Sequence, residues 1–263
     1  MLSSMCRSKA EGNRRCANSS RLEKLNAADL APSTNGAPSV DWAKDDLQPL
    51  WQKYDRDQVC VALETVEAAA GNDGRTYRDM GSAAAAAGAQ LHGAVYRIKS
   101  PESLARKIST KMEAADALEE QPSAQETAAR ITDVTRYTAL SAEHDQIVPT
   151  SKAVVADLEA RGWQVIEAEH SYMSGNPYKG LHLLIRHQDG QVAELQIQSA
   201  RSQEIKDRAH VLYNISRDTS RPTSERRQAA QENKRLYDDL PAPAGLDTLD
   251  KLGSVLVRKK RYS

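Results

Sequence analysis

The sequence predicts an α+β fold, in which a five-stranded mixed sheet is flanked by helices and carries helical additions at both ends. Two observations carry this prediction. From residue 94 onward, short segments with strand-like alternation take turns with longer segments that have helical spacing. Near the end of that series, Asp189-Gly190 separates two strand-like segments and is a typical hairpin turn.

Four regions are expected along the chain. Residues 1–40 are rich in Ser, Asn, Ala and Arg with almost no apolar periodicity, which predicts a disordered segment that could serve as a secretion or sorting signal. Residues 41–92 have a helical pattern, interrupted by an expected turn at Gly71-Asn72-Asp73-Gly74. The main domain is expected over residues 93–220. Residues 221–263 are expected to form a helix and a basic, solvent-exposed tail that ends in Arg258-Lys259-Lys260-Arg261.

The expected strands are residues 94–99, 130–139, 163–170, 180–187 and 191–198. The expected helices of the same region are residues 101–118, 150–161, 200–216 and 222–238. The first helix has the clearest start. Ser100 is a good N-cap, Pro101 suits the first helical position, and Glu102 is an acidic residue in the first turn.

Composition excludes several classes of protein. The chain has 36 basic and 36 acidic residues, so no overall charge favours nucleic acid or a membrane, and a polyanion site must be a local cluster. No apolar run approaches the roughly 20 residues of a membrane span. The 3 cysteines show no metal-ligand spacing, and their odd number argues against a disulfide framework. We therefore expect a reducing compartment, the cytoplasm, as the site of action.

One local cluster of cations has the pattern of a polyphosphate site. Arg97 and Lys99 share a face if their segment is extended, and Ser103 and Lys107 share a face of the helix that follows. Three cations and a hydroxyl would then point toward one place.

A second group of polar residues lies on and around the expected hairpin. Glu194 and Gln196 alternate with aliphatic residues, so they line either a cleft or a solvated outer face. Tyr178 follows a Gly-Asn-Pro loop, where its ring could stack on a base or cover the edge of the sheet. His182 is the type of residue that more often has a structural role.

Asp133 is a carboxylate in a strand-like segment close to the cation cluster. Hard divalent ions prefer oxygen ligands, so Asp133 could hold Mg²⁺, or it could form a salt bridge at the end of a strand.

Taken in order, these motifs resemble the synthetase domain of RelA/SpoT-type alarmone synthetases, which has a nucleotidyltransferase-like fold. The motifs are Arg97-x-Lys99-x₃-Ser103-x₃-Lys107, then Asp133, then Tyr178-Lys179-x-x-His182, then Glu194-x-Gln196. The resemblance covers roughly residues 90–220. The continuation through His210-x-x-Tyr213 to Arg217 is similar to the RelA/SpoT-like domains of bacterial toxins and effectors.

The resemblance implies a pyrophosphokinase, a nucleotide diphosphokinase of the GTP diphosphokinase type. It would move the two terminal phosphates of ATP to the ribose 3′-hydroxyl of an acceptor such as GDP, GTP, ADP or ATP. Arg97, Lys99 and Lys107 would neutralise the ATP phosphates, and Ser103 would donate a hydrogen bond to them. Asp133 would hold Mg²⁺, and Glu194 would help to hold it or take the proton of the attacking hydroxyl. Tyr178 would stack on the acceptor base, Lys179 and His182 would contact the acceptor phosphates, and Gln196 would support the ribose.

Two departures from the family pattern concern the acceptor side. Arg136 and Thr138 stand three and five residues after Asp133, where the family has Gly and Arg, and Arg136 is expected among the ATP contacts. In a regular strand Arg136 would face away from Asp133, so a bulge or a strand end is needed to bring both to one site. The stretch from Met112 to Ala129 is also longer than the family leads us to expect.

Several alternatives stay open at this point. The chain could be a bacterial toxin or injected effector, a housekeeping small alarmone synthetase, an enzyme that pyrophosphorylates the 3′ end of tRNA, or a non-catalytic nucleotide-binding module. A toxin or effector could have an immunity protein or a secretion chaperone as partner. The dipeptide His144-Asp145 lies within the synthetase region, so we expect no alarmone hydrolase domain of the kind that the bifunctional relatives carry upstream.

Overall fold

The computed structural model describes residues 18–33 and 36–262, and these divide into two compact units. The first unit draws on residues 18–30, 42–67 and 100–131, and the second on residues 31–41, 68–99 and 132–262. Among the described residues, every helix is too short or too polar to span a bilayer.

The first unit is helical. Its helices are α1 (Ser19–Leu22), α2 (Ala27–Leu30), the 3₁₀ helix η1 (Asp41–Lys44), α3 (Leu50–Lys53), the start of α4 (Arg56–Ala86), α5 (Pro101–Asp116) and α6 (Ala124–Ala129). The start of α5 is confirmed, because the Ser100 hydroxyl accepts a hydrogen bond from the backbone N–H of Ser103. Leu104 and Ile108 lie four residues apart and are fully buried, so α5 packs its apolar stripe inward.

Two expectations for the N-terminal half need correction. Within the stretch expected to be disordered, α1 and α2 form and bury Leu22 and Leu30, whereas residues 1–17, 34 and 35 lie outside the described part of the chain. The turn expected at residues 71–74 is wrong, because α4 runs through it without a break. Asp73 is buried there in an ion pair, and this tertiary contact outweighs the low helix propensity of the two glycines.

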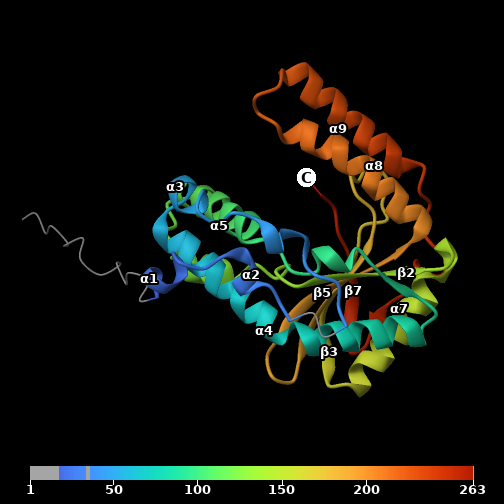
Figure 1. The fold of residues 1–263 in the computed structure, drawn as a ribbon. Coiled ribbons are helices and arrows are strands. Elements are labelled where there is room, and N and C mark those ends of the chain that lie inside the picture. Colours follow the sequence, from blue (N-terminus) through green and yellow to red (C-terminus); the bar gives the residue numbers. More distant parts are fainter. Residues whose placement is uncertain (1–17, 34–35, 263) are drawn as a thin grey trace, which may run out of the picture. The chain divides into compact units, whose positions relative to one another are not determined.

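The second unit is built on a sheet of seven strands rather than the expected five, in the order β1-β2-β5-β4-β3-β7-β6. Figure 1 labels β2, β3, β5 and β7 of this sheet. The strands are β1 (Gln90–His92), β2 (Arg136–Ser141), β3 (Trp163–His170), β4 (Leu181–His187), β5 (Val192–Ser199), β6 (Lys251–Leu252) and β7 (Val255–Lys259). The β2–β5 and β3–β7 pairs are parallel and the others antiparallel, so the sheet is mixed as expected.

The strand expected at residues 94–99 is also wrong. Gly93 adopts a left-handed φ of 59° and starts the 3₁₀ helix η2 (Ala94–Tyr96), which ends at Arg97 in a helical conformation. A single antiparallel bridge between Ile98 and Thr135 is the only strand-like pairing recorded in this stretch of the described chain. Consequently Arg97 and Lys99 do not share a face.

The C-terminal tail adds two of the three strands that the sequence did not predict, β6 and β7, and the third is β1. Backbone pairing places β7 beside β3, with Glu169 opposite Arg258. Arg258, Lys259 and Arg261 have exposed side chains, as expected, but Arg258 and Lys259 belong to β7 and so are part of the sheet instead of a free end.

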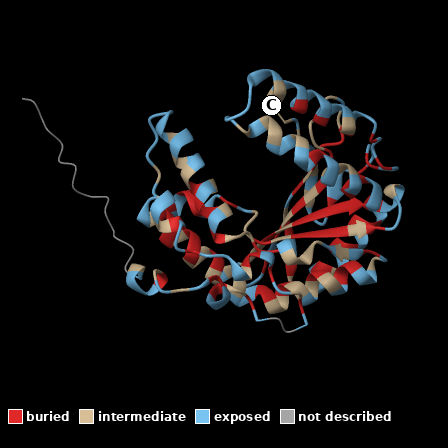
Figure 2. Cartoon of the chain, turned by 45° about the horizontal axis from the view of Figure 1, so that its top comes forward, coloured by how far each residue is buried: buried red, intermediate tan, exposed pale blue. Residues whose placement is uncertain are grey.

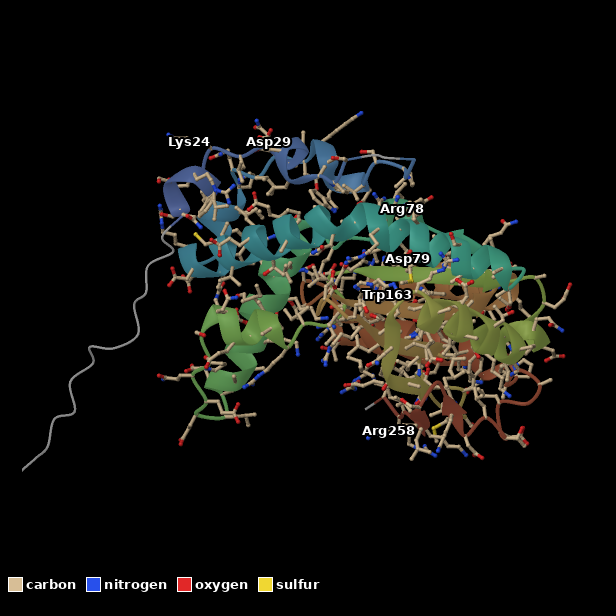
Figure 3. All side chains as sticks on the ribbon, turned by 90° about the horizontal axis from the view of Figure 1, so that it is seen from below. Lys24, Asp29, Arg78, Asp79, Trp163 and Arg258 are labelled. Atoms are coloured by element: carbon tan, nitrogen blue, oxygen red, sulfur yellow. The ribbon has the colours of Figure 1, made fainter. Side chains whose placement is uncertain are left out.

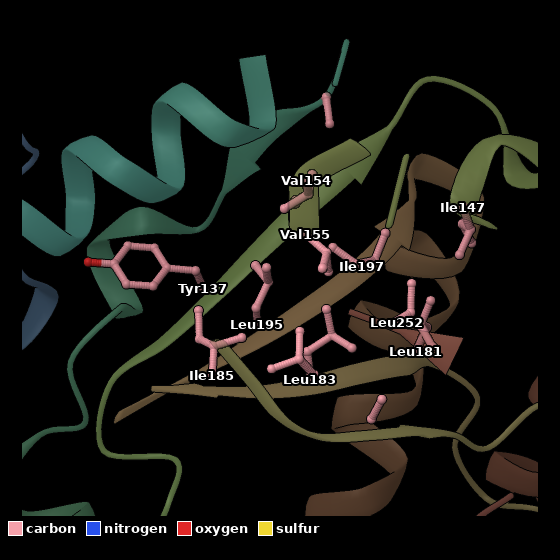
Figure 4. Packing of buried hydrophobic residues seen from close by; sticks show 14 of the residues in the cluster. Tyr137, Ile147, Val154, Val155, Leu181, Leu183, Ile185, Leu195, Ile197 and Leu252 are labelled. Carbon is pink, nitrogen blue, oxygen red and sulfur yellow. The ribbon is translucent and has the colours of Figure 1, made fainter. Parts of the chain in front are cut away.

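One face of the sheet is aliphatic and forms the core (Figure 4). Helix α7 (Ile147–Ala160) packs on it through Val154 and Val155, above Leu195 and Ile197 of β5 and Leu183 of β4. The second half of α4 adds Met80 and Ala83 to this core, and its Asp79 carboxylate accepts a hydrogen bond from the Trp163 indole at 3.0 Å (Figure 3). The burial of the strands is visible in Figure 2.

The opposite face of the sheet is polar. One row across neighbouring strands consists of Thr138, Gln196, His182, Glu169 and Arg258. A register shift in β3 between Val165 and Glu167 turns Glu169 to this face, while Ala168 stays in the core. The antiparallel helices α8 (Ala200–Arg217) and α9 (Thr223–Asp238) follow β5, and α8 contacts both β2 and β5. The 3₁₀ helix η3 (His144–Gln146) completes the unit.

Candidate active site

Three of the segments that the sequence singled out lie side by side. The backbone N–H of Lys99 donates to the carbonyl of Val134 at 2.9 Å, and that of Arg136 donates to the carbonyl of Arg97 at 2.8 Å. On the other side of the same strand start, the N–H of Glu194 donates to the carbonyl of Thr135 at 2.9 Å. The segments around Lys99, Asp133 and Glu194 are therefore joined by direct backbone hydrogen bonds.

Lys99 and Asp133 form an ion pair, with Nζ and Oδ2 3.2 Å apart and both side chains less than one-fifth exposed. Asp133 lies in the turn before β2 and not inside a strand. Asp133 therefore lies at a strand end, which is the arrangement that the sequence pattern required if Asp133 and Arg136 were to serve one site. Because Asp133 precedes the strand, its side chain is not bound by the alternation that governs Arg136.

Arg97 does not belong to a phosphate site. Its guanidinium is fully buried and donates to both oxygens of Asp73 at 2.8 to 3.0 Å, and also to the carbonyls of Pro38 and Ala94. The Tyr137 hydroxyl donates to the same Asp73 carboxylate at 3.1 Å. Tyr137 points to the aliphatic face of β2, so the Arg97 guanidinium and Glu194 lie on opposite faces of the sheet.

Ser103 and Lys107 are on α5, which belongs to the first unit, whereas Lys99 belongs to the second. Both are half-buried and lie one helical turn apart on one face, as the sequence predicts. Their part in ATP binding remains a prediction.

Glu194 lies near the start of β5 on the face of the sheet opposite the core. Its Oε1 accepts a hydrogen bond from the Gln196 side-chain amide at 2.6 Å, and the oxygen of that amide accepts one from the Lys206 ammonium at 2.8 Å. Arg136 is the in-register neighbour of Glu194 on β2, so both side chains leave the sheet on the same face. A carboxylate, an amide and two cations are therefore gathered at the start of β2 and β5.

Tyr178 and His182 form a second, connected group. The Gln198 amide donates to the Tyr178 hydroxyl at 2.7 Å, which leaves the hydroxyl proton for His182 Nε2, also at 2.7 Å. Burial lowers the pKa of His182 to about 4, so the ring is neutral at pH 7 and carries its proton on Nδ1. That atom is 3.6 Å from Glu194 Oε1, too far for a hydrogen bond.

Gly180 permits this arrangement. A Cβ at this position would lie 2.6 Å from the Tyr178 hydroxyl and 2.9 Å from His182 Nε2, closer than real Cβ contacts. Only glycine leaves room for the hydrogen bond between Tyr178 and His182.

The ring of Tyr178 already has neighbours. Tyr237 and Tyr262 meet it edge-on at centroid distances of 5.6 and 6.1 Å, and burial raises the pKa of its hydroxyl well above 10. An acceptor base that stacked on Tyr178 would have to compete with these rings. Tyr262 is held by its backbone N–H, which donates to the Asn176 side chain at 3.2 Å.

Lys179 is directed away from this group. It is buried, and its ammonium donates to the carbonyl of Leu240 at 2.8 Å, which ties the end of α9 to the loop before β4. Burial also lowers the pKa of Lys179. The expected contact between Lys179 and acceptor phosphates is therefore not supported, because the amine satisfies backbone carbonyls inside the fold.

The binding of Mg²⁺ by the two carboxylates remains a prediction. Within the described part of the chain, no group of three or more His, Cys, Asp or Glu side chains could hold a metal by itself. Mg²⁺ is usually bound by one or two carboxylates together with substrate phosphates. Asp133 and Glu194 are residues of the right type and lie on segments joined by backbone hydrogen bonds.

Sequence reasoning missed three polar residues of this region. Lys206 reaches Gln196 from α8, while Lys260 and Tyr262 of the tail meet Glu169 and Tyr178. Lys206 lies on the same side of α8 as the buried Ser202, Gln203 and Ala209, and because two of these residues are polar, no signal in the sequence marked that buried side. Instead the sequence drew attention to His210, Tyr213 and Arg217, all of which are exposed.

Among known proteins, similarity to this chain was found in solved structures. No model of a protein family matches the chain, and no curated protein matches its sequence. A chain from the crystal structure of the complex between the Type VI effector Tas1 and its immunity protein is similar, with 19% identity, a TM-score of 0.37, and coverage of 69% of this chain and 93% of that chain.

The small alarmone synthetase 1 from Bacillus subtilis is also similar, with 16% identity, a TM-score of 0.39, and coverage of 57% of this chain and 71% of that chain. The same synthetase bound to its product pppGpp gives 17% identity, a TM-score of 0.35, and coverage of 57% and 74%. An alarmone synthetase and a Type VI effector complex are thus among the structures that this chain is similar to. Similarity at this level assigns neither an activity nor a ligand, which must come from the residues themselves.

Proposed function

We propose that the chain is an ATP-dependent pyrophosphokinase, which transfers the β,γ-diphosphate of ATP to the ribose 3′-hydroxyl of an acceptor nucleotide. The observation that carries this proposal is the direct backbone pairing of the segments around Lys99, Asp133 and Glu194. Phosphoryl transfer needs positioning and neutralisation of charge more than covalent catalysis. A half-buried lysine and two carboxylates at one end of a rigid sheet can supply both.

Each residue then has a stated part. The oxygen of the 3′-hydroxyl attacks the β-phosphorus of ATP, the bond from that phosphorus to the oxygen bridging it to the α-phosphate breaks, and AMP leaves with that oxygen. Glu194 takes the proton of the hydroxyl. Lys99 neutralises the triphosphate. Arg136, on the same face as Glu194, is a candidate phosphate contact.

Asp133 and Glu194 would hold Mg²⁺ together with the phosphates of the nucleotide. When bound, the ion would offset the negative charge that develops on the transferred group. Lys99 and Asp133, which form an ion pair with each other in the structure, would bind the phosphates and the ion respectively.

The experiment incubates the purified chain with ATP, Mg²⁺ and one acceptor at a time: GDP, GTP, ADP, ATP or deacylated tRNA. AMP release together with an acceptor that has gained two phosphates supports the proposal and identifies the acceptor. Binding of ATP without AMP release for every acceptor would support a non-catalytic nucleotide-binding module instead.

A role as toxin or injected effector rests on the resemblance of residues 194–217 to toxin domains, and an immunity protein or secretion chaperone would be its partner. Induced expression inside bacteria should stop growth. The matched variant Glu194→Gln should grow normally, whereas equal growth arrest by that variant would mean that the proposed chemistry is not the cause.

A further inference from the structure

Lys206 lies on the buried side of α8, and its ammonium group points at the polar face of the sheet. Its helix α8 starts directly after β5, at a capping box made by Ser199 and Ser202. This fixed start sets the rotation of the helix, so that position 206 faces β5 along with Ser202 and Ala209. The Lys206 ammonium donates to the oxygen of the Gln196 amide at 2.8 Å.

The side-chain amide of Gln196 links Lys206 to Glu194 by hydrogen bonds. A carboxamide has an acceptor end and a donor end, and a lysine ammonium can only donate, whereas the neutral amine could also accept. Lys206 therefore holds the oxygen of Gln196 and turns its NH₂ group toward Glu194 Oε1, 2.6 Å away. Without the cation the amide could flip, and its oxygen would then face the carboxylate and repel it.

The charged groups around Glu194 come from several elements. The charged ones are Arg136 on β2, Glu169 on β3, Lys206 with Asp207 on α8, and Lys260 on the tail, and the titratable but neutral His182 lies on β4. Lys206 is the only one of these that acts on Glu194 through a recorded chain of hydrogen bonds among the described residues. Burial, and secondly the charge of Arg136, lower the pKa of Lys206 from 10.5 to about 8.

We propose that Lys206 is a positioning residue of the pyrophosphokinase: its ammonium fixes the Gln196 amide, and the amide fixes Glu194 for the acceptor hydroxyl. The inference rests on the proposed function, because Glu194 is the base in that reaction. It assigns no direct contact between Lys206 and a substrate. It does require that Lys206 be charged for activity.

The kinetic test compares wild type, Lys206→Met, Lys206→Arg and the exposed control Lys234→Met on α9, with AMP release as the readout. Lys206→Met should lower kcat by about 100-fold, the size expected when a catalytic group loses its position, with the KM for ATP unchanged. In the wild type, kcat should fall as the pH rises through about 8. In Lys206→Arg that fall should move to higher pH, because a guanidinium keeps its proton. An unchanged kcat in Lys206→Met, or the same alkaline fall in Lys206→Arg, would overturn the inference.

A second readout does not depend on activity. The side-chain NH₂ resonances of Gln196, followed by NMR in ¹⁵N-labelled full-length protein, should shift with a midpoint near pH 8 in the wild type. These resonances should not shift near pH 8 in Lys206→Arg. If Lys206→Met does not fold, Lys206→Arg still tests the inference. No shift in the wild type would overturn the positioning role, whereas a shift in a protein that releases no AMP would refute only the proposed function.

Discussion

Lys206 also makes a prediction about stability that can be worked out from its pKa. The pKa is about 8 in the folded protein and is taken to have its ordinary value of 10.5 in the unfolded chain. Between these two values the unfolded state binds more protons than the folded state, so the free energy of unfolding rises with pH there. Below about pH 8 both states are protonated, and the burial of the charge destabilises the fold by a constant amount.

The size of this effect follows from the pKa difference. At about 1.4 kcal/mol per pH unit, the shift from 10.5 corresponds to about 3 kcal/mol, and about 1 to 3 kcal/mol is expected because Lys206 is only half-buried. Lys206→Met removes the titrating group but leaves all the others in place. The free energy of unfolding of the wild type minus that of Lys206→Met should therefore increase by this amount between about pH 7 and about pH 10.5.

Urea unfolding of both proteins across this pH range measures the difference directly, with Lys234→Met as a control for the loss of an exposed lysine. The control should track the wild type at every pH. The hydrogen bond that Gln196 loses in Lys206→Met adds a constant offset, because any weakening of that bond when wild-type Lys206 loses its proton is already contained in the pKa of Lys206. A difference that stays constant with pH would show that Lys206 does not titrate where its burial requires.

Three further predictions concern other residues. Asp73→Asn should lower the free energy of unfolding by about 3 kcal/mol, because it leaves the Arg97 guanidinium buried without its counter-charge, and urea unfolding checks this against the exposed control Asp247→Asn. Lys99→Met should raise the KM for ATP at least about 10-fold, because a charge-assisted phosphate contact is lost. The exposed control Lys152→Met should leave that KM unchanged. Equal KM values for the two variants would mean that Lys99 does not bind ATP. Tyr262→Ala should lower the KM for the acceptor if the base stacks on Tyr178, because it removes one of the rings at that site; a higher KM would mean that Tyr262 itself binds the acceptor.

The elements that the sequence predicts well are those in which local signals and packing agree. Strand β3 has the predicted bounds because its apolar alternation matches a strand with one face in the core. Helix α5 begins where Ser100 and Pro101 indicate, since cap and backbone preferences act within a few residues. The polar alternation of β5 correctly gathers Glu194 and Gln196 on one face.

The errors arise where a distant contact decides the outcome. Asp73 looks like part of a turn in sequence, but its burial against Arg97 holds α4 continuous. The same ion pair removes Arg97 from the place where spacing alone put it. The strands β6 and β7 are too short to show a period, and they form because β3 offers a free edge. The bulge in β3 and the contact of Lys206 with Gln196 depend on tertiary structure in the same way.

The measurement that tests the account most directly is AMP release from ATP, with Mg²⁺ and the preferred acceptor, by the wild type and by Glu194→Gln. The substitution removes the charge but little volume, and Glu232→Gln on the exposed side of α9 is the matched control. We predict steady AMP release by the wild type and by the control. Glu194→Gln should release AMP at least about 100-fold more slowly, as expected for loss of a general base, with an unchanged unfolding midpoint. Wild-type rates in Glu194→Gln, or no AMP release by the wild type with any acceptor, would contradict the central claim.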